Sequence, residues 1–209
     1  VEHSYPGLWL NDGDGWFIGS GEYGWTWGAT DVALGDLDGD TDLDFATAGD
    51  RWVSNYVFFN QGGAQGGTPG TFSYSDQDLG EGADDSGVAL GDLDGDGDLD
   101  LVFAKTVTNT NTVYTNTDHS GVFTDTGRAY GASMSYDVAL GDVDGDNELD
   151  AVFANHFANE VYINEGDAIF SASGQSLGNS PSYGVALGDI DGDDDLDAVF
   201  AGSVSSTVW

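Results

Sequence analysis

The sequence has no cysteine, only three basic residues and only three prolines. Without cysteine the chain can form neither a disulfide framework nor a thiolate metal site, whereas metals with oxygen ligands stay open. No run of about 18 apolar residues is present that could cross a bilayer, and we therefore expect no membrane insertion. With 39% apolar and 12% aromatic residues, the chain can bury a sizeable core.

The shortage of basic residues is matched by an excess of acid. There are 38 acidic residues, which gives a formal net charge of −35. Such a chain repels nucleic acid and anionic membrane surfaces, so nucleic acid is excluded as a partner. The same repulsion opposes folding unless it is neutralised, and bound divalent cations are the obvious means. The acid content therefore points to metal.

Four copies of one motif follow each other along the chain. They read DVALGDLDGDTDLDFATAG, GVALGDLDGDGDLDLVFAK, DVALGDVDGDNELDAVFAN and GVALGDIDGDDDLDAVFAG, and they occupy residues 31–49, 87–105, 137–155 and 184–202. Their first aspartates are 56, 50 and 47 residues apart. That period is typical of propeller blades and longer than most solenoid repeats.

The rest of each unit repeats more loosely and indicates four short strands. A third strand ends in Asn60, Asn116 or Asn164, and a fourth strand opens at a phenylalanine and ends in glycine. The phenylalanines are Phe72, Phe123 and Phe170, and the glycines are Gly80, Gly131 and Gly178. Alternating apolar residues and the absence of a helical stripe favour an all-β fold. We predict one domain over residues 1–209, a β-propeller of about four four-stranded blades.

The two ends of the chain resemble parts of a blade. Residues 1–30 match a third and a fourth strand, which places Trp9, Asn11 and Trp16 opposite Tyr162, Asn164 and Phe170. We expect residues 1–30 to complete the last blade and so to close the ring, with Trp16 in the core. However, Trp9 and Trp209 both align with Tyr162. This overlap leaves open that a terminal strand packs elsewhere or pairs with a neighbouring molecule.

Each motif contains a loop of the form D-x-D-G-D-x-(D/E)-L-D that predicts a metal site. A hard divalent ion takes six to eight oxygens, which short carboxylates at alternate positions of a curled loop can supply. The side chains at loop positions 1, 3, 5 and 9 are Asp36, Asp38, Asp40 and Asp44; Asp92, Asp94, Asp96 and Asp100; Asp142, Asp144, Asp146 and Asp150; and Asp189, Asp191, Asp193 and Asp197. Position 7, expected to offer its carbonyl, is Asp42, Asp98, Glu148 or Asp195.

Loop position 6 should need a left-handed backbone, which suits Gly97, Asn147 and Asp194 but not the β-branched Thr41. We therefore predict that the first loop is the most strained or binds its ion most weakly. An EF-hand reading fails, because that loop needs a glutamate at position 12, where this chain has Thr47 or a phenylalanine. An acidic turn without metal would leave unpaired carboxylates repelling one another at four equivalent places.

The segment GDLDGDGDLDLVFA resembles the calcium loop of FG-GAP/VCBS-type repeats, which form the blades of integrin α-subunit propellers and of many bacterial secreted proteins. The resemblance implies a four-stranded blade whose first two strands are joined by a calcium-binding loop, and roles in adhesion and ligand recognition. With one such loop in each of the four repeats, we expect about four Ca²⁺ ions per chain. Family propellers commonly have seven or more blades, whereas this chain has about four, so either the ring is unusually small or the chain is a piece of a larger assembly.

Three functions follow as expectations. The first is an extracellular or cell-surface binding, adhesion or assembly module that is stabilised by calcium, is not an enzyme, and has a protein or glycan ligand. The location rests on the calcium available outside cells and on Val1, which suggests a removed leader. The alternatives are a lectin for neutral carbohydrates and a fragment of a secreted polysaccharide-active enzyme. Candidate ligand-binding residues, on the connections opposite the metal loops, are Trp25, Trp27, Trp52, Tyr136, His156 and Tyr183.

Overall fold

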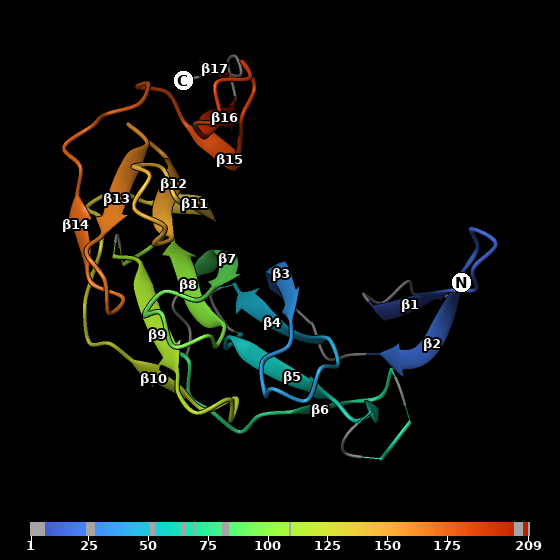
Figure 1. The fold of residues 1–209 in the computed structure, drawn as a ribbon. Helices are drawn as coiled ribbons and strands as arrows, with labels where there is room; N and C mark the ends of the chain where they lie inside the picture. The colour runs from blue at the N-terminus through green and yellow to red at the C-terminus, as the bar shows by residue number, and fades with distance from the viewer. Residues whose placement is uncertain are drawn as a thin grey trace.

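The computed structural model describes residues 7–23, 28–50, 53–63, 66–68, 70–80, 84–108, 110–202 and 207–208. Every named element in this part of the chain is a β-strand, and the strands pair only antiparallel (Figure 1). In these residues nothing helical has the length and apolarity needed to cross a bilayer. The all-β prediction is confirmed.

Each repeat folds into one sheet of sequential strands, which we call a blade. Blade 1 is β3 (Ala29–Gly35), β4 (Asp44–Gly49), β5 (Tyr56–Asn60) and β6 (Phe72–Tyr74). Blade 2 is β7 (Asp85–Gly91), β8 (Asp100–Lys105), β9 (Thr112–Asn116) and β10 (Phe123–Asp125). Blade 3 is β11 (Ser135–Gly141), β12 (Asp150–Asn155), β13 (Glu160–Asn164) and β14 (Phe170–Ala172). Blade 4 is β15 (Ser182–Gly188), β16 (Asp197–Gly202) and β17 (Thr207–Val208).

The predicted strand boundaries hold with one exception. The third strands end at the predicted asparagines and the fourth strands open at the predicted phenylalanines. The fourth strands are only three residues long, however, and do not run on to the glycines. Pairing returns at the isolated bridges Asn111–Tyr130 and Asn159–Leu177, just before Gly131 and Gly178. The outermost strand therefore leaves its neighbour and rejoins it before the glycine.

The core lies between successive blades. In the second strands, small residues of one blade meet larger ones of the next, as where Ala46 and Ala48 of blade 1 lie in one buried cluster with Leu101 and Phe103 of blade 2. The same arrangement recurs between blades 2 and 3 and between blades 3 and 4. Contacts join the first strands β3, β7, β11 and β15 in that order. Burial of these faces, at about 25 cal/mol per Å², is what holds the stack together.

The blades form an open arc, with blade 4 at one end and blade 1 at the other (Figure 1). Residues at the start of the chain form a hairpin of β1 (Gly7–Asn11) and β2 (Phe17–Tyr23), which is a two-stranded sheet by itself. Within the described residues this hairpin pairs with no strand of blade 4, and β17 takes the third-strand position there. Completion of the last blade by residues 1–30 and closure of the ring stay predictions.

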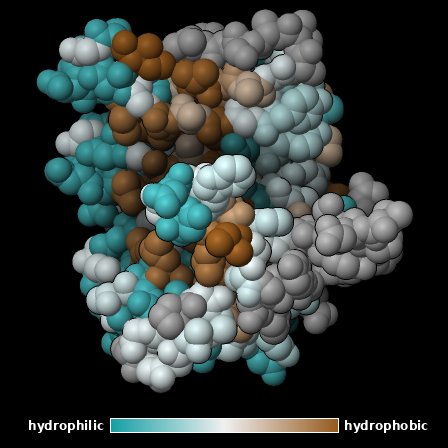
Figure 2. Space-filling model, turned by 90° about the vertical axis from the view of Figure 1, so that its right-hand side faces the viewer, coloured by the Kyte–Doolittle hydropathy of each residue, from teal (hydrophilic) through white to brown (hydrophobic). Residues whose placement is uncertain are grey.

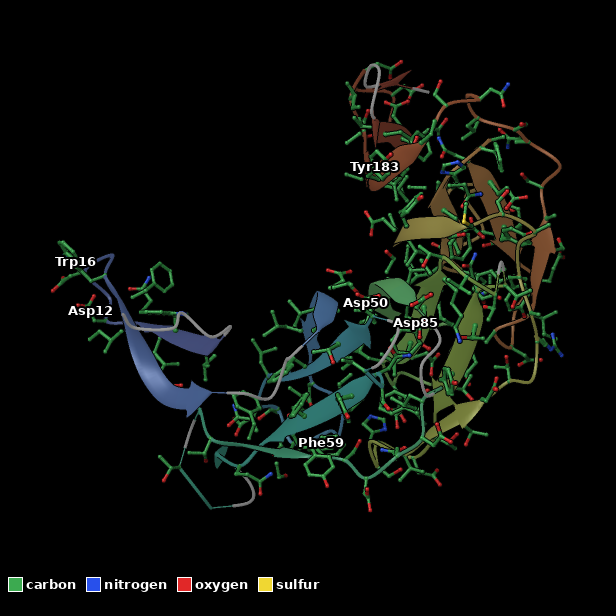
Figure 3. All side chains as sticks on the ribbon, turned by 180° about the vertical axis from the view of Figure 1, so that it is seen from behind. Asp12, Trp16, Asp50, Phe59, Asp85 and Tyr183 are labelled. Carbon is green, nitrogen blue, oxygen red and sulfur yellow. The ribbon has the colours of Figure 1, made fainter. Side chains whose placement is uncertain are left out.

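The prediction that Trp16 lies in the core is wrong. Its side chain is 75% exposed, in the turn of the hairpin (Figure 3). Asn11 pairs with Phe17, as Asn164 pairs with Phe170, so Phe17 and not Trp16 takes the phenylalanine position. Trp16 corresponds to Ile169, which is also exposed. The residue before the phenylalanine belongs to the turn, where no blade face is available to cover it.

Candidate metal centres

The four aspartate-rich loops join the first two strands of each blade, between β3 and β4, β7 and β8, β11 and β12, and β15 and β16. Two positions of every loop have a left-handed backbone. Position 4 is always glycine, and position 6 has φ of 76° at Thr41, 93° at Gly97, 72° at Asn147 and 73° at Asp194. The predicted left-handed conformation at position 6 is confirmed, including at threonine. These two reversals curl the loop so that alternate side chains point inward.

Carboxylates converge in each of the four loops. One oxygen from each of three aspartates lies within 4.8 Å of the other two, in the first three loops from positions 1, 3 and 5, and in the fourth from positions 1, 3 and 9. The groups are Asp36, Asp38 and Asp40; Asp92, Asp94 and Asp96; Asp142, Asp144 and Asp146; and Asp189, Asp191 and Asp197. Three acidic oxygens at that spacing could hold a metal ion.

The first aspartate of each loop also organises the backbone around it. In the third loop, Asp142 accepts hydrogen bonds from the amides of Gly145 at 2.7 Å and Asn147 at 2.9 Å. Asp36, Asp92 and Asp189 accept from the same two positions of their own loops. Local bonds of this kind fix a turn without regular secondary structure. The sequence therefore preforms the loop before any ion is considered.

In the first three loops the aspartate at position 9 links the loop to the third strand, while its predicted role as a metal ligand stays a prediction. Asp44 is fully buried and accepts the amide of Leu37 at 2.8 Å and that of Asn60 at 2.7 Å, which ties the loop to the third strand. Asp100 and Asp150 make the equivalent pairs of bonds. Burial raises the pKa of Asp44 to about 6 and that of Asp100 to about 7, against the lowering effect of these amides. Neighbouring loop aspartates add to the rise.

The electrostatics of the loops favour a cation. Burial, and then the neighbouring charges of Asp40 and Asp36, raise the pKa of Asp38, and the pKa of Asp94 is raised in the same way. A buried oxygen of Asp40, Oδ2, receives no hydrogen bond from the described residues. Buried carboxylate oxygens without a donor are unfavourable unless a positive charge meets them. The donors are all hard oxygens, so the loops fit Ca²⁺ or Mg²⁺ better than softer metals.

A second group of predicted residues meets near the opposite ends of blades 3 and 4. The Tyr136 hydroxyl lies 3.1 Å from His156 Nδ1, and the rings of Tyr136 and Tyr183 are 5.0 Å apart. Phe157 stacks edge-on against His156 at 4.9 Å. Tyr183 and Phe157 are 54% and 58% exposed. We call these four residues the aromatic cluster.

The backbone explains why two tyrosines reach this cluster. Each first strand carries an irregularity of register at the same place, between Ser135 and Asp137 in β11 and between Ser182 and Gly184 in β15. Tyr136 and Tyr183 are the residues in between, and bulges of this kind re-aim a side chain. Sequence analysis missed Phe157, although it lies next to His156. Trp25, Trp27 and Trp52 lie outside the described residues.

Comparison with known proteins agrees with the repeat structure. The family model of the FG-GAP-like repeat matches residues 92–153 and again residues 142–200, together a little over half of the chain. Each match runs from the first aspartate of one metal loop to the second strand of the next blade. A search of curated proteins finds no match. With its four repeated loops and blades, the chain belongs to the family of FG-GAP-like repeat proteins.

Proposed function

We propose that the chain is an extracellular, non-catalytic binding or adhesion module whose four loops bind structural calcium. The observation that carries the proposal is the convergence of three aspartate oxygens within 4.8 Å in all four repeats. Calcium is favoured over magnesium because such a loop supplies several carboxylates and carbonyls, whereas Mg²⁺ usually keeps most of its water. Membership of the FG-GAP-like family supports the same ion.

A structural role for the ions follows from where the loops lie. Each loop joins two strands of one blade, and in the first two loops the side chains of Leu37 and Leu93 are fully buried against the next blade. Asp36, Asp38 and Asp40 would hold the ion in the first loop, and their counterparts would do so in the others. Bound calcium would neutralise carboxylates that otherwise repel one another, and so would stabilise both the blade and the interface above it.

The test is a thermal melt with and without a calcium chelator, together with metal analysis. We expect about four Ca²⁺ per chain and a melting temperature that falls by more than ten degrees in chelator. Asp94→Asn should reduce the count to about three, while Asp76→Asn, an exposed aspartate outside the loops, should leave it unchanged. An unchanged melt in chelator, or equal counts in both variants, would contradict the proposal.

The aromatic cluster favours a second candidate function, the binding of a neutral carbohydrate. Exposed aromatic rings can stack on the apolar face of a sugar, and His156 and the Tyr136 hydroxyl can hydrogen-bond its hydroxyls. The chain offers only three cations, so an acidic glycan would find little direct attraction. Tyr183→Ala should abolish binding on a glycan array, and Tyr74→Ala, an equally exposed tyrosine on blade 1, should not. An array without hits would exclude this candidate.

A further inference from the structure

The two ends of the arc expose the two halves of the interface that the chain builds three times internally. At each internal interface an alanine in the second strand of one blade lies in the same buried cluster as a phenylalanine in the second strand of the next; the alanines are Ala48, Ala104 and Ala154, and the phenylalanines are Phe103, Phe153 and Phe200. Among the described residues no other blade packs against the first-strand part of the corresponding face of blade 1, where Val32, Leu34 and Leu43 are 53%, 62% and 59% exposed. The equivalent Val88 and Val138 are 6% and 5% exposed. The part of this face that is exposed is therefore the part made by Val32, Leu34 and Leu43, whereas Thr47 and Phe58 on the same face are buried.

Blade 4 presents the opposite half. Ile190 at loop position 2 is 54% exposed, whereas its counterparts Leu37 and Leu93 are fully buried under the following blade. Figure 2, which looks at the open side of the arc, shows apolar residues gathered on this side of the molecule. We infer that a second copy of this chain docks head to tail, with the blade 4 face of one copy against the blade 1 face of the next.

The glycine that ends each first strand shows how closely the two faces match. A Cβ on Gly35 would lie 2.4 Å from Leu99 Cδ1 of the next blade, and Cβ atoms on Gly91 and Gly141 would meet Leu149 and Leu196 in the same way. A leucine side chain of the next blade therefore packs directly against each of these glycines. Gly188 of blade 4 has nothing within 4 Å of the equivalent position. In the docked pair, Leu43 and Leu34 of the second copy pack against Gly188.

Polar groups match at the same interface. Internally, the Asn116 side chain donates to the Leu37 carbonyl at 2.9 Å, and Asn164 donates to the Leu93 carbonyl at 2.8 Å. The corresponding pair across the docked ends is Asn60 and the Ile190 carbonyl. The docked ends can thus form both an apolar contact and a specific hydrogen bond, which is what a selective interface requires.

The hairpin at the start of the chain occupies the outer part of the same face. Leu8 and Leu10 lie beside Gly70 of blade 1, where an added Cβ would be 3.6 Å from Leu10 Cδ1. Val161 and Ile163 of β13 pack against blade 4 in the corresponding way. The hairpin is thus placed as the two outer strands of a blade that would precede blade 1. Strands β15 and β16 of a second copy would supply the two inner strands.

Blade 4 has a position for the hairpin to fill. In the other blades the ninth loop aspartate accepts the amide of the third-strand asparagine, as Asp150 accepts that of Asn164. Among the described residues, Asp197 accepts only the amide of Ile190. The amide of Asn11, which aligns with Asn164, supplies the missing donor when the hairpin of the second copy replaces β17. The interface is heterologous, so repeated docking gives a ring or a fibre.

This inference rests on the proposed function and deepens it by naming a partner for the module. Three substitutions that leave the net charge unchanged test it. Leu34→Gln places a polar side chain on the apolar blade 1 face, and Gly188→Gln fills the space on the blade 4 face where a leucine would pack. Val122→Gln, at an apolar residue that is 56% exposed away from both faces, is the matched control. Mass is measured by light scattering across a concentration series in calcium buffer, against a monomer of 21.8 kDa.

The wild type and the control should form multiples of the monomer mass. Leu34→Gln and Gly188→Gln should each weaken association about tenfold or more. A 1:1 mixture of these two variants should give a dimer and nothing larger, because it restores one interface only. A wild type that stays monomeric at high concentration would overturn the inference, as would variants that associate like the control. Calcium counts are measured on the same samples, so loss of calcium binding, which contradicts the proposed function, is distinguished from loss of docking.

Discussion

Thr41 carries the least favourable backbone conformation among the four metal loops. Its φ of 76° lies in the left-handed region, where a β-branched residue is strained by about 1–3 kcal/mol. Asn147 holds the same position in the third loop with φ of 72°. Asparagine tolerates this conformation better because its side chain is not branched at Cβ and can hydrogen-bond locally.

Thr41→Asn should therefore raise the free energy of unfolding by about 1 kcal/mol, measured by denaturant titration in calcium buffer. The reciprocal change Asn147→Thr is the matched control and should lower it by a similar amount. If both variants have the same free energy of unfolding as the wild type, the left-handed conformation at position 6 does not reduce stability. If only the calcium affinity of the first loop changes, the strain is relieved by local movement when the ion is absent.

Asp85 gives the protein a pH dependence of unusual sign. The carboxylate is buried, receives a hydrogen bond from the Asn55 side chain and lies 3.6 Å from Lys105 Nζ. Burial nevertheless raises its pKa to about 6, above the unfolded value of about 3.9. The folded state thus binds this proton more tightly than the unfolded state does. The contribution of Asp85 to stability is complete below about pH 4 and is lost as the pH rises to about 6.

The measurement is a carbon-detected NMR titration of the Asp85 carboxyl group in the folded protein. We expect a midpoint near 6. The same titration in denaturant, where an aspartate has its ordinary pKa of about 4, serves as the reference. A midpoint near 4 at Asp85 would show that attraction to Lys105 outweighs burial.

At the scale of the elements, the glycine at the end of each first strand decides how closely two blades approach. Gly91→Ala places a Cβ about 2.6 Å from Leu149 Cδ1, so the neighbouring leucine must move. Overpacking of this kind should cost about 1–3 kcal/mol. Gly188→Ala meets nothing within 4 Å and should be neutral or stabilise by up to about 1 kcal/mol, since alanine restricts the unfolded chain.

Both variants are compared by thermal melts at low protein concentration, where each chain is separate. Opposite or clearly different shifts are expected for the two alanines. Equal losses at Gly91 and Gly188 would mean that the effect belongs to the strand end itself and not to the contact between blades.

The elements themselves could largely be predicted from the sequence. The motif repeats so closely that Asn60, Asn116 and Asn164 marked the strand ends correctly, and the aspartate spacing indicated loops that do bring carboxylates together. Position 9 shows what spacing cannot reveal. Asp44 is predicted as a metal ligand, which stays a prediction, and in the structure it also accepts two backbone amides, one of them from a residue 16 positions away. Only the fold brings that distant amide to the carboxylate.

The arrangement of the whole molecule is harder to predict for a physical reason. Ring closure depends on the angle between neighbouring blades, and that angle follows from how side chains such as Leu99 seat on glycines such as Gly35. A small difference at each interface accumulates over the arc. The repeat pattern therefore indicated blades but could not decide whether Trp9 or Trp209 takes the third-strand place in the last blade. Thr207–Val208 pairs there in the structure.

The formal charge of −35 acts on the molecule as a whole. Self-repulsion at this charge destabilises the compact state, and calcium at four loops would still leave 27 negative charges. Salt shortens the screening length from about 10 Å at 0.1 M to about 3 Å at 1 M. The melting temperature in chelator should therefore rise by several degrees when NaCl is raised over this range. Sucrose, which adds no ions, separates screening from a general effect of solute.

Calcium neutralises the most crowded carboxylates, so the same increase in NaCl should raise the melting temperature less in calcium buffer than in chelator. An equal rise in both buffers would show that the loops carry no bound cation.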